Sequence, residues 1–335
     1  MGRRVHAPRR GSLAYYPRVR ALRIVPRIRR WPKIKGGTRL LGFAAYKVGM
    51  THSIVIEDNP ASPFYGRELI KAVTVLEAPP LFVFGVRAYV ASNRGLQVLT
   101  EVLAEDLPKD LKRVMPLPNR PESGQKLKII ESRINEVVEV RVLACTQPRK
   151  SGLGKKSPEV LEIKVGGGTV KEQFEYAKSI LGKEVKVHEV FKEGQYVDVI
   201  AVTKGKGFQG VVKRFGVKIL TRWHKHRKGA RKVGAISPQH PSMLFTVPRP
   251  GQLGFHTRTE YNKRILKIGS DPKEVNVKGG FVGYGVVKSD HIILEGSVPG
   301  PRKRLVRMRF PIRMPEAEPK PVKVVAINLD SKQGV

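Results

Sequence analysis

The chain has 335 residues, 40% of them hydrophobic, which is enough for one large domain or two ordinary ones with a sizeable core. It contains 64 lysines and arginines against 28 aspartates and glutamates, a net charge of +36. An excess of this size repels itself in a compact state unless a polyanion neutralises it. The composition therefore favours a nucleic-acid partner.

The single cysteine, Cys145, excludes an internal disulfide and a cysteine-rich zinc site. Its apolar, strand-like surroundings predict a small buried residue. No apolar run approaches the ~20 residues of a membrane span. Arginine and proline interrupt the N-terminal region too often for the apolar part of a signal peptide. We therefore expect a cytoplasmic protein with no membrane partner.

The positive charge is concentrated in three segments. Residues 1–56 and 199–259 contain 14 and 13 lysines and arginines, respectively, and no acidic residue. Six more basic residues lie within Arg302–Arg313, whereas residues 57–198 are nearly neutral, with 22 basic and 20 acidic residues. Charge that only solubilises a protein would be scattered, so this pattern indicates basic segments that insert among phosphates.

Residues 1–38 are predicted to form a basic N-terminal extension. Pro8, Pro17, Pro26 and Pro32 exclude a long helix, and the apolar residues are too few to form a core. Such a segment is expected to be disordered alone and to become ordered on its partner.

Short β-like runs follow at residues 40–58, 69–79 and 81–92, which are rich in valine and aromatic residues. Gly49, inside the first run, indicates a turn or a close approach of another group. Residues 104–115 and 124–138 have apolar residues at helical spacing, and the pattern returns to a strand at 137–147.

The clearest helix is predicted over Thr169–Leu181. Thr169 can cap it, Glu172 completes a capping box, and Gly182 supplies the stop. The preceding glycines, 166–168, are compatible with a phosphate site at the helix N-terminus or with a flexible turn. The turn is favoured, because the last glycine is not followed directly by the lysine and serine or threonine of a P-loop.

The pattern after Gly182 is β again. Several short runs with glycine turns predict a mainly β fold, a small barrel or sandwich, into which an α/β portion is inserted. The expected strands lie in residues 186–191, 195–203, 210–220, 264–269, 275–287, 291–298 and 304–312.

Gly205, Gly207 and Gly210 have the G-x-G-x-x-G spacing of a dinucleotide-binding turn. That turn must lead into a helix and needs an acidic residue about 20 positions later. Here the next residues predict a strand, and no acid occurs until Glu260. We therefore expect no nicotinamide or flavin cofactor. The glycines instead allow close approach to a sugar-phosphate backbone, beside the cations Lys204, Lys206, Lys213 and Arg214.

Residues 217–260 form a long basic insertion that interrupts the strands, and insertions of this length are usually functional or disordered. Trp223, His224 and His226 lie among many cations, so their rings can stack on unpaired bases while the cations hold phosphates. Zinc binding by histidines including His240 is disfavoured, because no cysteine or carboxylate is near. A catalytic histidine lacks a serine–aspartate partner, and a core position for Trp223 stays open.

Several segments, in the same order along the chain, resemble the large-subunit ribosomal protein L3 family in its archaeal and eukaryotic form. They are "HAPRRGSLAYYPR" at 6–18, "GFAAYKVGMTH" at 42–52, "GKGFQGVVKRFGV" at 205–217, "RKVGAISPQHPS" at 231–242, "PGQLGFHTRTEYNKRILKIG" at 250–269 and "SVPGPRKRLVRMR" at 297–309.

The resemblance implies a translation-protein-type β-barrel with basic extensions. The barrel would comprise residues 39–79 and 183–315, interrupted by an α/β insertion at 80–182 and carrying a basic finger at 217–260. Residues 1–38 would be the N-terminal arm, the run around Arg302–Arg313 would be a third basic element, and 316–335 would be a C-terminal tail.

The resemblance also implies function. It implies binding to large-subunit rRNA, support of early subunit assembly, neighbouring large-subunit ribosomal proteins, and a finger that reaches toward the peptidyl transferase centre. It implies no enzyme activity, cofactor, metal, small-molecule substrate or homo-oligomer. Many relatives carry a tryptophan at the finger tip, where this chain has Gln239, so hydrogen bonding is expected there in place of stacking.

The residues predicted to contact RNA are Arg3, Arg4, Arg9, Arg10, Arg18, Arg20, Lys204, Lys206, Lys213, Arg214, Arg222, Trp223, His224, Lys225, His226, Arg227, Lys228, Arg231, Lys232, Gln239, His240, Arg249, His256, Arg258, Arg302, Lys303 and Arg304. Two rival functions make different predictions. A DNA-packing protein would bind duplex DNA at least as well as rRNA, and an oxidoreductase would be stabilised by a nicotinamide cofactor.

Overall fold

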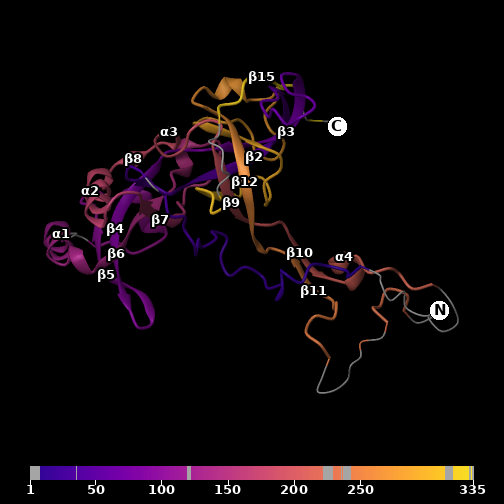
Figure 1. Ribbon diagram of the computed structural model, residues 1–335, viewed down its shortest axis with the longest axis horizontal. Coiled ribbons are helices and arrows are strands. Elements are labelled where there is room, and N and C mark those ends of the chain that lie inside the picture. The colour runs from indigo at the N-terminus through magenta and orange to yellow at the C-terminus, as the bar shows by residue number, and fades with distance from the viewer. Residues whose placement is uncertain are drawn as a thin grey trace. The chain divides into compact units, whose positions relative to one another are not determined.

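The computed structural model describes residues 8–34, 36–118, 122–221, 229–234, 236, 243–313, 320–331 and 333. The chain divides into two compact units. Unit 1 comprises Met1–Ile24 and Val202–Arg258, and unit 2 comprises Val25–Ala201 and Thr259–Val335. The protein is mainly β with several sheets (Figure 1), which confirms that part of the predicted fold.

The larger sheet has seven strands. In spatial order they are β14 (Leu305–Arg309), β9 (Tyr196–Val202), β12 (Thr257–Gly269), β13 (His291–Glu295), β3 (Glu68–Glu77), β2 (Gly42–Ile56) and β15 (Val324–Ile327). β2 also pairs with β14, from Leu305 opposite Tyr46 to Arg309 opposite Gly42. The sequence missed β15, which lies in the expected C-terminal tail.

β2 is buried along most of its first half, because the sheet is covered on both sides there. Its register with β3 shifts between Lys47 and Gly49. A Cβ at Gly49 would lie 2.7 Å from Cδ1 of Phe281, so only glycine fits without a shift of that ring. The predicted close approach at Gly49 is thus confirmed.

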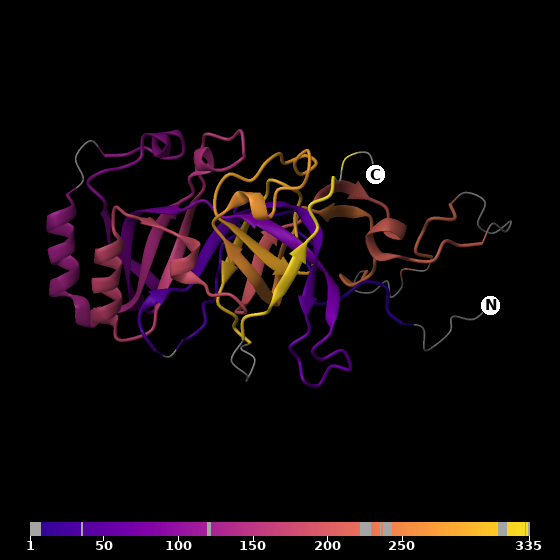
Figure 2. The same cartoon turned by 90° about the horizontal axis from the view of Figure 1, so that it is seen from above.

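A second sheet contains the α/β portion. Its strands are ordered β1 (Arg39–Leu40), β7 (Val160–Gly166), β6 (Val137–Cys145), β4 (Leu81–Ser92) and β5 (Gly95–Leu103), and β8 (Glu184–Val185) pairs with β4. Helices α1 (Ser123–Ser132) and α2 (Val170–Ile180) lie next to each other beside it (Figure 2). An ion pair of 2.9 Å joins Lys178 to Glu131 across the two helices.

The start and stop of α2 are as predicted. The Thr169 hydroxyl accepts from the backbone N–H of Glu172, and the Glu172 carboxylate accepts from that of Thr169. Gly182 has a φ of +76°, which suits the residue after a helix end. The Glu172 carboxylate already lies at the N-terminus of α2, so the glycines before it form a turn rather than a phosphate site.

Three segments expected as strands are not strands. Residues 186–191 contain the short helix α3 (Val187–Val190), and 210–220 contain the short helix α4 (Val211–Phe215). Residues 275–287 form turns with a single bridge between Phe281 and Gly285. Apolar residues in runs this short fit the repeat of a helix as well as that of a strand, so alternation alone does not distinguish the two. The helix expected at 104–115 is reduced to the 3₁₀ turn η1 (Lys109–Arg113).

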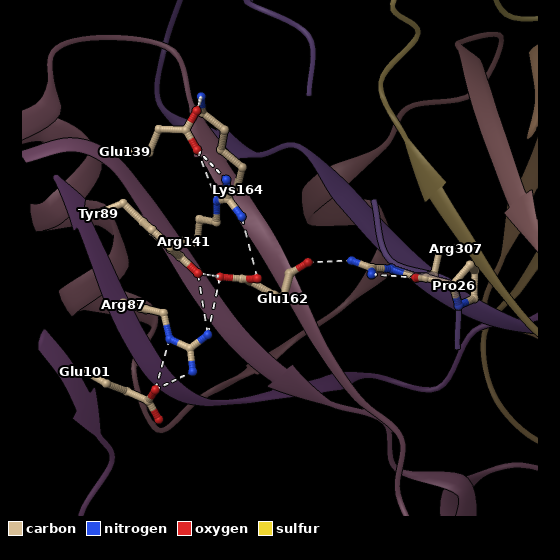
Figure 3. A network of polar contacts seen from close by, with 9 residues as sticks. All are labelled: Pro26, Arg87, Tyr89, Glu101, Glu139, Arg141, Glu162, Lys164 and Arg307. Carbon is tan, nitrogen blue, oxygen red and sulfur yellow. Dashed lines mark hydrogen bonds and ion pairs between the residues drawn. The ribbon is translucent and has the colours of Figure 1, made fainter. Parts of the chain in front are cut away.

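Arg307 of β14 ties the segment Val25–Ile34 to both sheets (Figure 3). It is 4% exposed, and it donates to the carbonyl of Pro26 at 2.9 Å and to the carbonyl of Glu162 on β7. Ile28 in that segment is also buried, at 6% exposure. Part of the predicted N-terminal extension, residues 25–34, therefore packs into unit 2.

The Glu162 side chain lies in a mixed network of charges on the second sheet (Figure 3). It accepts from the Tyr89 hydroxyl and forms ion pairs with Arg87 at 3.7 Å and Arg141 at 3.6 Å. Arg87 also pairs with Glu101, and Glu139 pairs with Arg141 and Lys164. The positive and negative groups of this face thus compensate one another within the protein.

Arg309, two residues beyond Arg307, is buried as well. Its guanidinium contacts the fully buried Asp198 carboxylate at 3.1 and 3.2 Å and the carbonyl of Arg30 at 2.5 Å. Two of the six basic residues in the Arg302–Arg313 run are therefore buried in unit 2 and bond to groups of its interior. Cys145 is 2% exposed, as predicted, and burial raises the pKa of its thiol to about 12.

None of the helices in the described ranges is long and apolar enough to cross a membrane. Nor do the described residues bring three or more His, Cys, Asp or Glu side chains into a group that could hold a metal ion. The histidines considered for zinc, His224, His226 and His240, lie outside the described residues.

Candidate nucleic-acid interface

Unit 1 contains no acidic residue. Its two segments hold seven and 13 lysines and arginines, respectively, and no aspartate or glutamate. The ion pairs found among the described residues all lie in unit 2. The cations of unit 1 must therefore be held by other groups or remain exposed.

The scaffold of unit 1 is a pair of antiparallel strands, β10 (Gly205–Gln209) and β11 (Gly251–Gly254), with α4 next to them (Figure 1). Val211 and Phe215 of α4 are buried and lie one turn apart. Gly216 ends the helix with a φ of +65°. The sequence pattern missed this helix because a single turn leaves little periodicity to detect.

The arrangement differs from a dinucleotide site although a helix does follow the glycines. That site uses a parallel strand–helix–strand unit, whereas β10 pairs antiparallel with β11. Among the three motif glycines only Gly207 has a left-handed backbone, with a φ of +66°. Lys206 and Phe208 of β10 are exposed, as is Lys204 just before the strand, and Phe208 is 75% exposed. An exposed aromatic ring on a strand that carries a lysine suits base stacking beside phosphate contact.

Two arginines share one aromatic ring. The guanidinium carbon of Arg18 lies 4.1 Å from the centre of the Phe215 ring, and that of Arg214 lies 5.2 Å from it. Arg18 donates to the carbonyl of Arg214 at 2.9 Å. Arg214 donates to the carbonyls of Gln252 at 3.0 Å and Arg249 at 2.8 Å. Carbonyl oxygens and a ring face thus hold both side chains without any carboxylate.

A third arginine is held in the same way. The guanidinium carbon of Arg258 lies 4.3 Å from the centre of the Tyr15 ring, which is half exposed. Two residues earlier, the ring nitrogen Nδ1 of His256 donates to the carbonyl of Val19 at 2.7 Å. The backbone N–H of Ala21 donates to the carbonyl of Phe255 at 2.8 Å. These contacts join residues 15–21 to the chain around His256.

The positive charges of these guanidinium groups affect the pKa values of their neighbours. Burial lowers the pKa of His256, and the charges of Arg258, Arg214 and Arg18 lower it further. Burial lowers the pKa of Arg214 and of Arg258, and the charge of Arg18 lowers both further. Arginine keeps its charge at neutral pH, so this is a cluster of three cations around a neutral imidazole.

Aromatic residues near the N-terminus line the same unit. Tyr16 stacks on Phe215 with ring centres 6.1 Å apart and meets Phe245 edge-on at 5.8 Å. Arg9 donates to the carbonyl of Thr246, and the Arg20 guanidinium lies 5.6 Å from the Phe255 ring centre. Phe245 is itself 70% exposed.

The structure brings together Arg18, Arg214, His256 and Arg258 from the set predicted by sequence. Others are exposed in unit 1 without a described partner for their charged groups: Arg10, Lys204, Lys206, Lys213, Arg231, Lys232 and Arg249. Arg302, Lys303 and Arg304 belong to unit 2 and precede β14. The predicted residues Arg3, Arg4, Arg222, Trp223, His224, Lys225, His226, Arg227, Lys228, Gln239 and His240 lie outside the described residues.

Sequence reasoning missed the aromatic residues that hold the arginines. Tyr15, Tyr16, Phe215 and Phe255 stay off the predicted set, although the run "AYYPRVR" at 14–20 interleaves aromatic and basic residues. That interleaving was the available signal. The contact between His256 and Val19 left no signal in the sequence, because the two residues are 237 positions apart.

Comparison with known proteins identifies the family. The family model described as ribosomal protein L3 matches residues 1–334. The large ribosomal subunit protein uL3 of Pyrobaculum calidifontis is 57% identical over 323 residues, which cover 95% of this chain and 96% of that protein. The uL3 proteins of Pyrobaculum islandicum, 55% identical over 95% and 94% of the two chains, and of Methanopyrus kandleri, 50% identical over 98% and 92%, are also similar. The chain therefore belongs to the ribosomal protein L3 family.

Proposed function

We propose that this protein binds large-subunit rRNA through unit 1 and that it supports early assembly of the subunit. Its place in the family makes it a structural component of the large subunit of the cytoplasmic ribosome and not an enzyme. Its partners are accordingly rRNA and neighbouring ribosomal proteins. The proposal concerns which residues of the protein contact the RNA.

The observation that carries the proposal is the absence of carboxylates from unit 1. Twenty lysines and arginines without an internal counter-charge need an external polyanion, because repulsion among them opposes a compact state. Exposed rings such as those of Phe208 and Phe245 lie among these cations. Unpaired bases of folded RNA stack on such rings, whereas the bases of duplex DNA are already stacked on one another.

We further propose that six strands, β14, β9, β12, β13, β3 and β2, form a closed barrel. Their pairings support this, since each strand pairs with the next and β2 pairs back to β14. In this assignment residues 80–182 are an insertion into the barrel protein, 1–38 and 217–260 are the arm and finger that enter the RNA, and 316–335 are the tail.

The finger is proposed to approach the peptidyl transferase centre with Gln239 at its tip. Replacement of Gln239 by alanine is expected to slow peptidyl transfer or tRNA accommodation in reconstituted ribosomes, while the melting temperature of the free protein stays unchanged. Wild-type translation rates in that variant would remove Gln239 from the site.

Direct binding tests the main proposal. Three exposed lysines of unit 1, Lys204, Lys206 and Lys213, are changed together to glutamine. The matched control changes three exposed lysines of unit 2 that form no ion pair with another described residue, Lys112, Lys128 and Lys171. Affinity for large-subunit rRNA fragments is measured over a range of salt. The unit 1 variant should lose affinity, and its log–log salt slope should fall by about two to three if each lysine contacts one phosphate.

The control should bind like wild type. Equal loss in both variants would show that charge anywhere on the protein serves equally well, which contradicts a site in unit 1. Duplex DNA of equal length, at the same salt, gives the second comparison. Tighter binding to the DNA would favour the rival function of DNA packing.

A further inference from the structure

We infer that Arg18, Arg214 and Arg258 form a built binding site for a single RNA phosphate group in unit 1. The inference rests on the proposed function, because it assigns one contact within the proposed rRNA interface. It goes beyond general electrostatic attraction, since it names a fixed site that is formed before RNA arrives.

The three guanidinium groups are held in place by neighbouring side chains. Each lies against an aromatic ring: Arg18 and Arg214 against Phe215, and Arg258 against Tyr15. All three are half-buried, so their freedom is restricted while part of each group still reaches solvent. Binding then loses less side-chain entropy than it would with lysines on flexible stems.

The hydrogen bonds to carbonyl groups leave some N–H donors of these arginines unused. An arginine has five N–H donors. Arg258 uses one of its terminal nitrogens for the carbonyl of Thr257, and Arg18 uses one for that of Arg214. The Nε of Arg18 is buried and has no hydrogen-bond partner among the described residues, so the donors that remain for a ligand are terminal N–H groups. The cluster therefore offers several N–H groups to one multidentate acceptor, and a phosphate with two free oxygens has that chemistry.

The cluster of three arginines is costly in free energy without a bound anion. Three like charges around one imidazole raise the free energy of the folded unit, and no carboxylate of unit 1 offsets them. Cation–π contacts recover only part of this cost. A bound phosphodiester would neutralise the repulsion and satisfy the remaining donors together.

His256 acts as a positioning residue rather than as a ligand. Its Nδ1 holds the carbonyl of Val19, which fixes the arm next to Arg18, while its Nε2 is buried without a described partner. The neutral imidazole can hold the arm without adding a fourth positive charge. Burial and the neighbouring guanidinium groups both keep it neutral.

The test measures amide hydrogen exchange in the full-length protein while inorganic phosphate replaces chloride at constant ionic strength. The reporters are the N–H groups of Ala21 and Thr203, which bond to the carbonyls of Phe255 and His256 next to the cluster. Phosphate should slow their exchange severalfold in the wild type. The effect should be absent in Arg258→Gln and Arg18→Gln.

Arg23→Gln is the matched control, because Arg23 lies in the same arm, is exposed and has no described contact. It should keep the full phosphate effect. Arg18→Gln also removes a bond to the backbone and can loosen the arm by itself. Arg258→Gln loses the contact with the Tyr15 ring as well, so the phosphate effect in each variant is measured against the exchange rate of that same variant without phosphate.

The outcomes separate this inference from the proposed function. A phosphate effect that persists in Arg258→Gln, or that is absent in the wild type, overturns the site even if rRNA binding is strong. Arg258→Gln should also weaken rRNA binding and reduce the salt slope by about one. An unchanged slope in that variant, together with a lost phosphate effect, overturns the assignment to RNA and leaves a site for free phosphate. Failure of the wild type to prefer rRNA over DNA would instead overturn the proposed function.

Discussion

The backbone N–H of Gly152 is shared by the two carboxylate oxygens of Glu77, at 3.2 and 3.0 Å. Glu77 ends β3 and is completely buried, and Gly152 belongs to the loop after β6 of the second sheet. The same carboxylate accepts from the backbone N–H groups of Lys288 at 2.7 Å and Ser289 at 3.0 Å, and from the Tyr284 hydroxyl. One buried anion thus joins the second sheet to the larger one without any cation among the described residues.

Replacement of Glu77 by glutamine should lower the free energy of unfolding by about 1–3 kcal/mol, because an amide accepts at one oxygen only and turns its NH₂ group toward buried donors. Urea unfolding at neutral pH measures the loss. Glu175→Gln on the exposed face of α2 is the control, and it should change stability little. Equal stability of the two variants would contradict the role given to Glu77.

Arg307→Gln should release the segment Val25–Ile34 from unit 2. The substitution removes the donors that hold the carbonyls of Pro26 and Glu162. Burial lowers the pKa of Arg307 to about 10. The site is only 4% exposed, so water cannot readily take over the hydrogen bonds that the guanidinium group makes. Limited trypsin digestion should therefore cut at Arg27, Arg29 or Arg30 faster than in the wild type.

The control for that experiment is Arg302→Gln, which changes an exposed arginine a few residues earlier. It should leave the cleavage rate in the segment unchanged. Equal rates in Arg307→Gln and wild type would mean that packing of Ile28 and Trp31 holds the segment without Arg307.

Acid should destabilise unit 2 through His291. This residue is 0% exposed, and neither ring nitrogen has a hydrogen-bond partner among the described residues. Burial lowers its pKa below the usual value of 6.5, more than the attraction of Glu274 raises it. Protons then bind more tightly to the unfolded chain, so stability is full above about pH 6.5 and falls as the pH drops toward the folded-state pKa.

His291→Leu, which cannot bind a proton, should show a shallower loss of melting temperature between neutral pH and pH 5 than the wild type. Its melting temperature at neutral pH gives the separate cost of repacking. A parallel decline in the two proteins would assign the acid sensitivity to other groups, such as His256 in unit 1.

Gly254→Ala should disrupt the β10–β11 pair. Gly254 has a φ of +75°, and a Cβ there would lie 2.0 Å from the carbonyl oxygen of Lys204. Gly154→Ala in unit 2 is the control, since its Cβ would meet nothing within 4 Å and its backbone is not left-handed. We expect weaker rRNA binding only in Gly254→Ala. Equal binding by the two variants would show that the strand pair is not needed for RNA contact.

Local chemistry explains which parts of the fold the sequence predicts. The capping box of Thr169 and Glu172 involves residues three apart, so a short window contains all of its information. The long strands β2, β3 and β4 were also evident in the sequence, because many apolar residues in each fit the same strand-like pattern. The helices α3 and α4 are one turn each, and two or three buried valines or phenylalanines do not define a period.

The candidate site shows the same limit. Charge segregation is visible in the sequence, and it indicates the segments that make up unit 1. The partners of the arginines are backbone carbonyls and rings from distant positions, such as the carbonyl of Gln252 for Arg214 and the ring of Tyr15 for Arg258. A carbonyl group is present at every position and so leaves no trace in composition. Only the fold selects which ones face a guanidinium group.

The way unit 1 holds its arginines also determines how it can meet RNA. A surface whose cations sit in ion pairs must break those pairs before a phosphate takes the place of the carboxylate, so each new contact is an exchange of partners. Unit 1 has no carboxylate to release, and a carbonyl or ring contact leaves other N–H groups of the same guanidinium available. Association then displaces mainly the small ions condensed on the RNA. Binding should in consequence respond strongly to ionic strength and hardly at all to pH above neutrality.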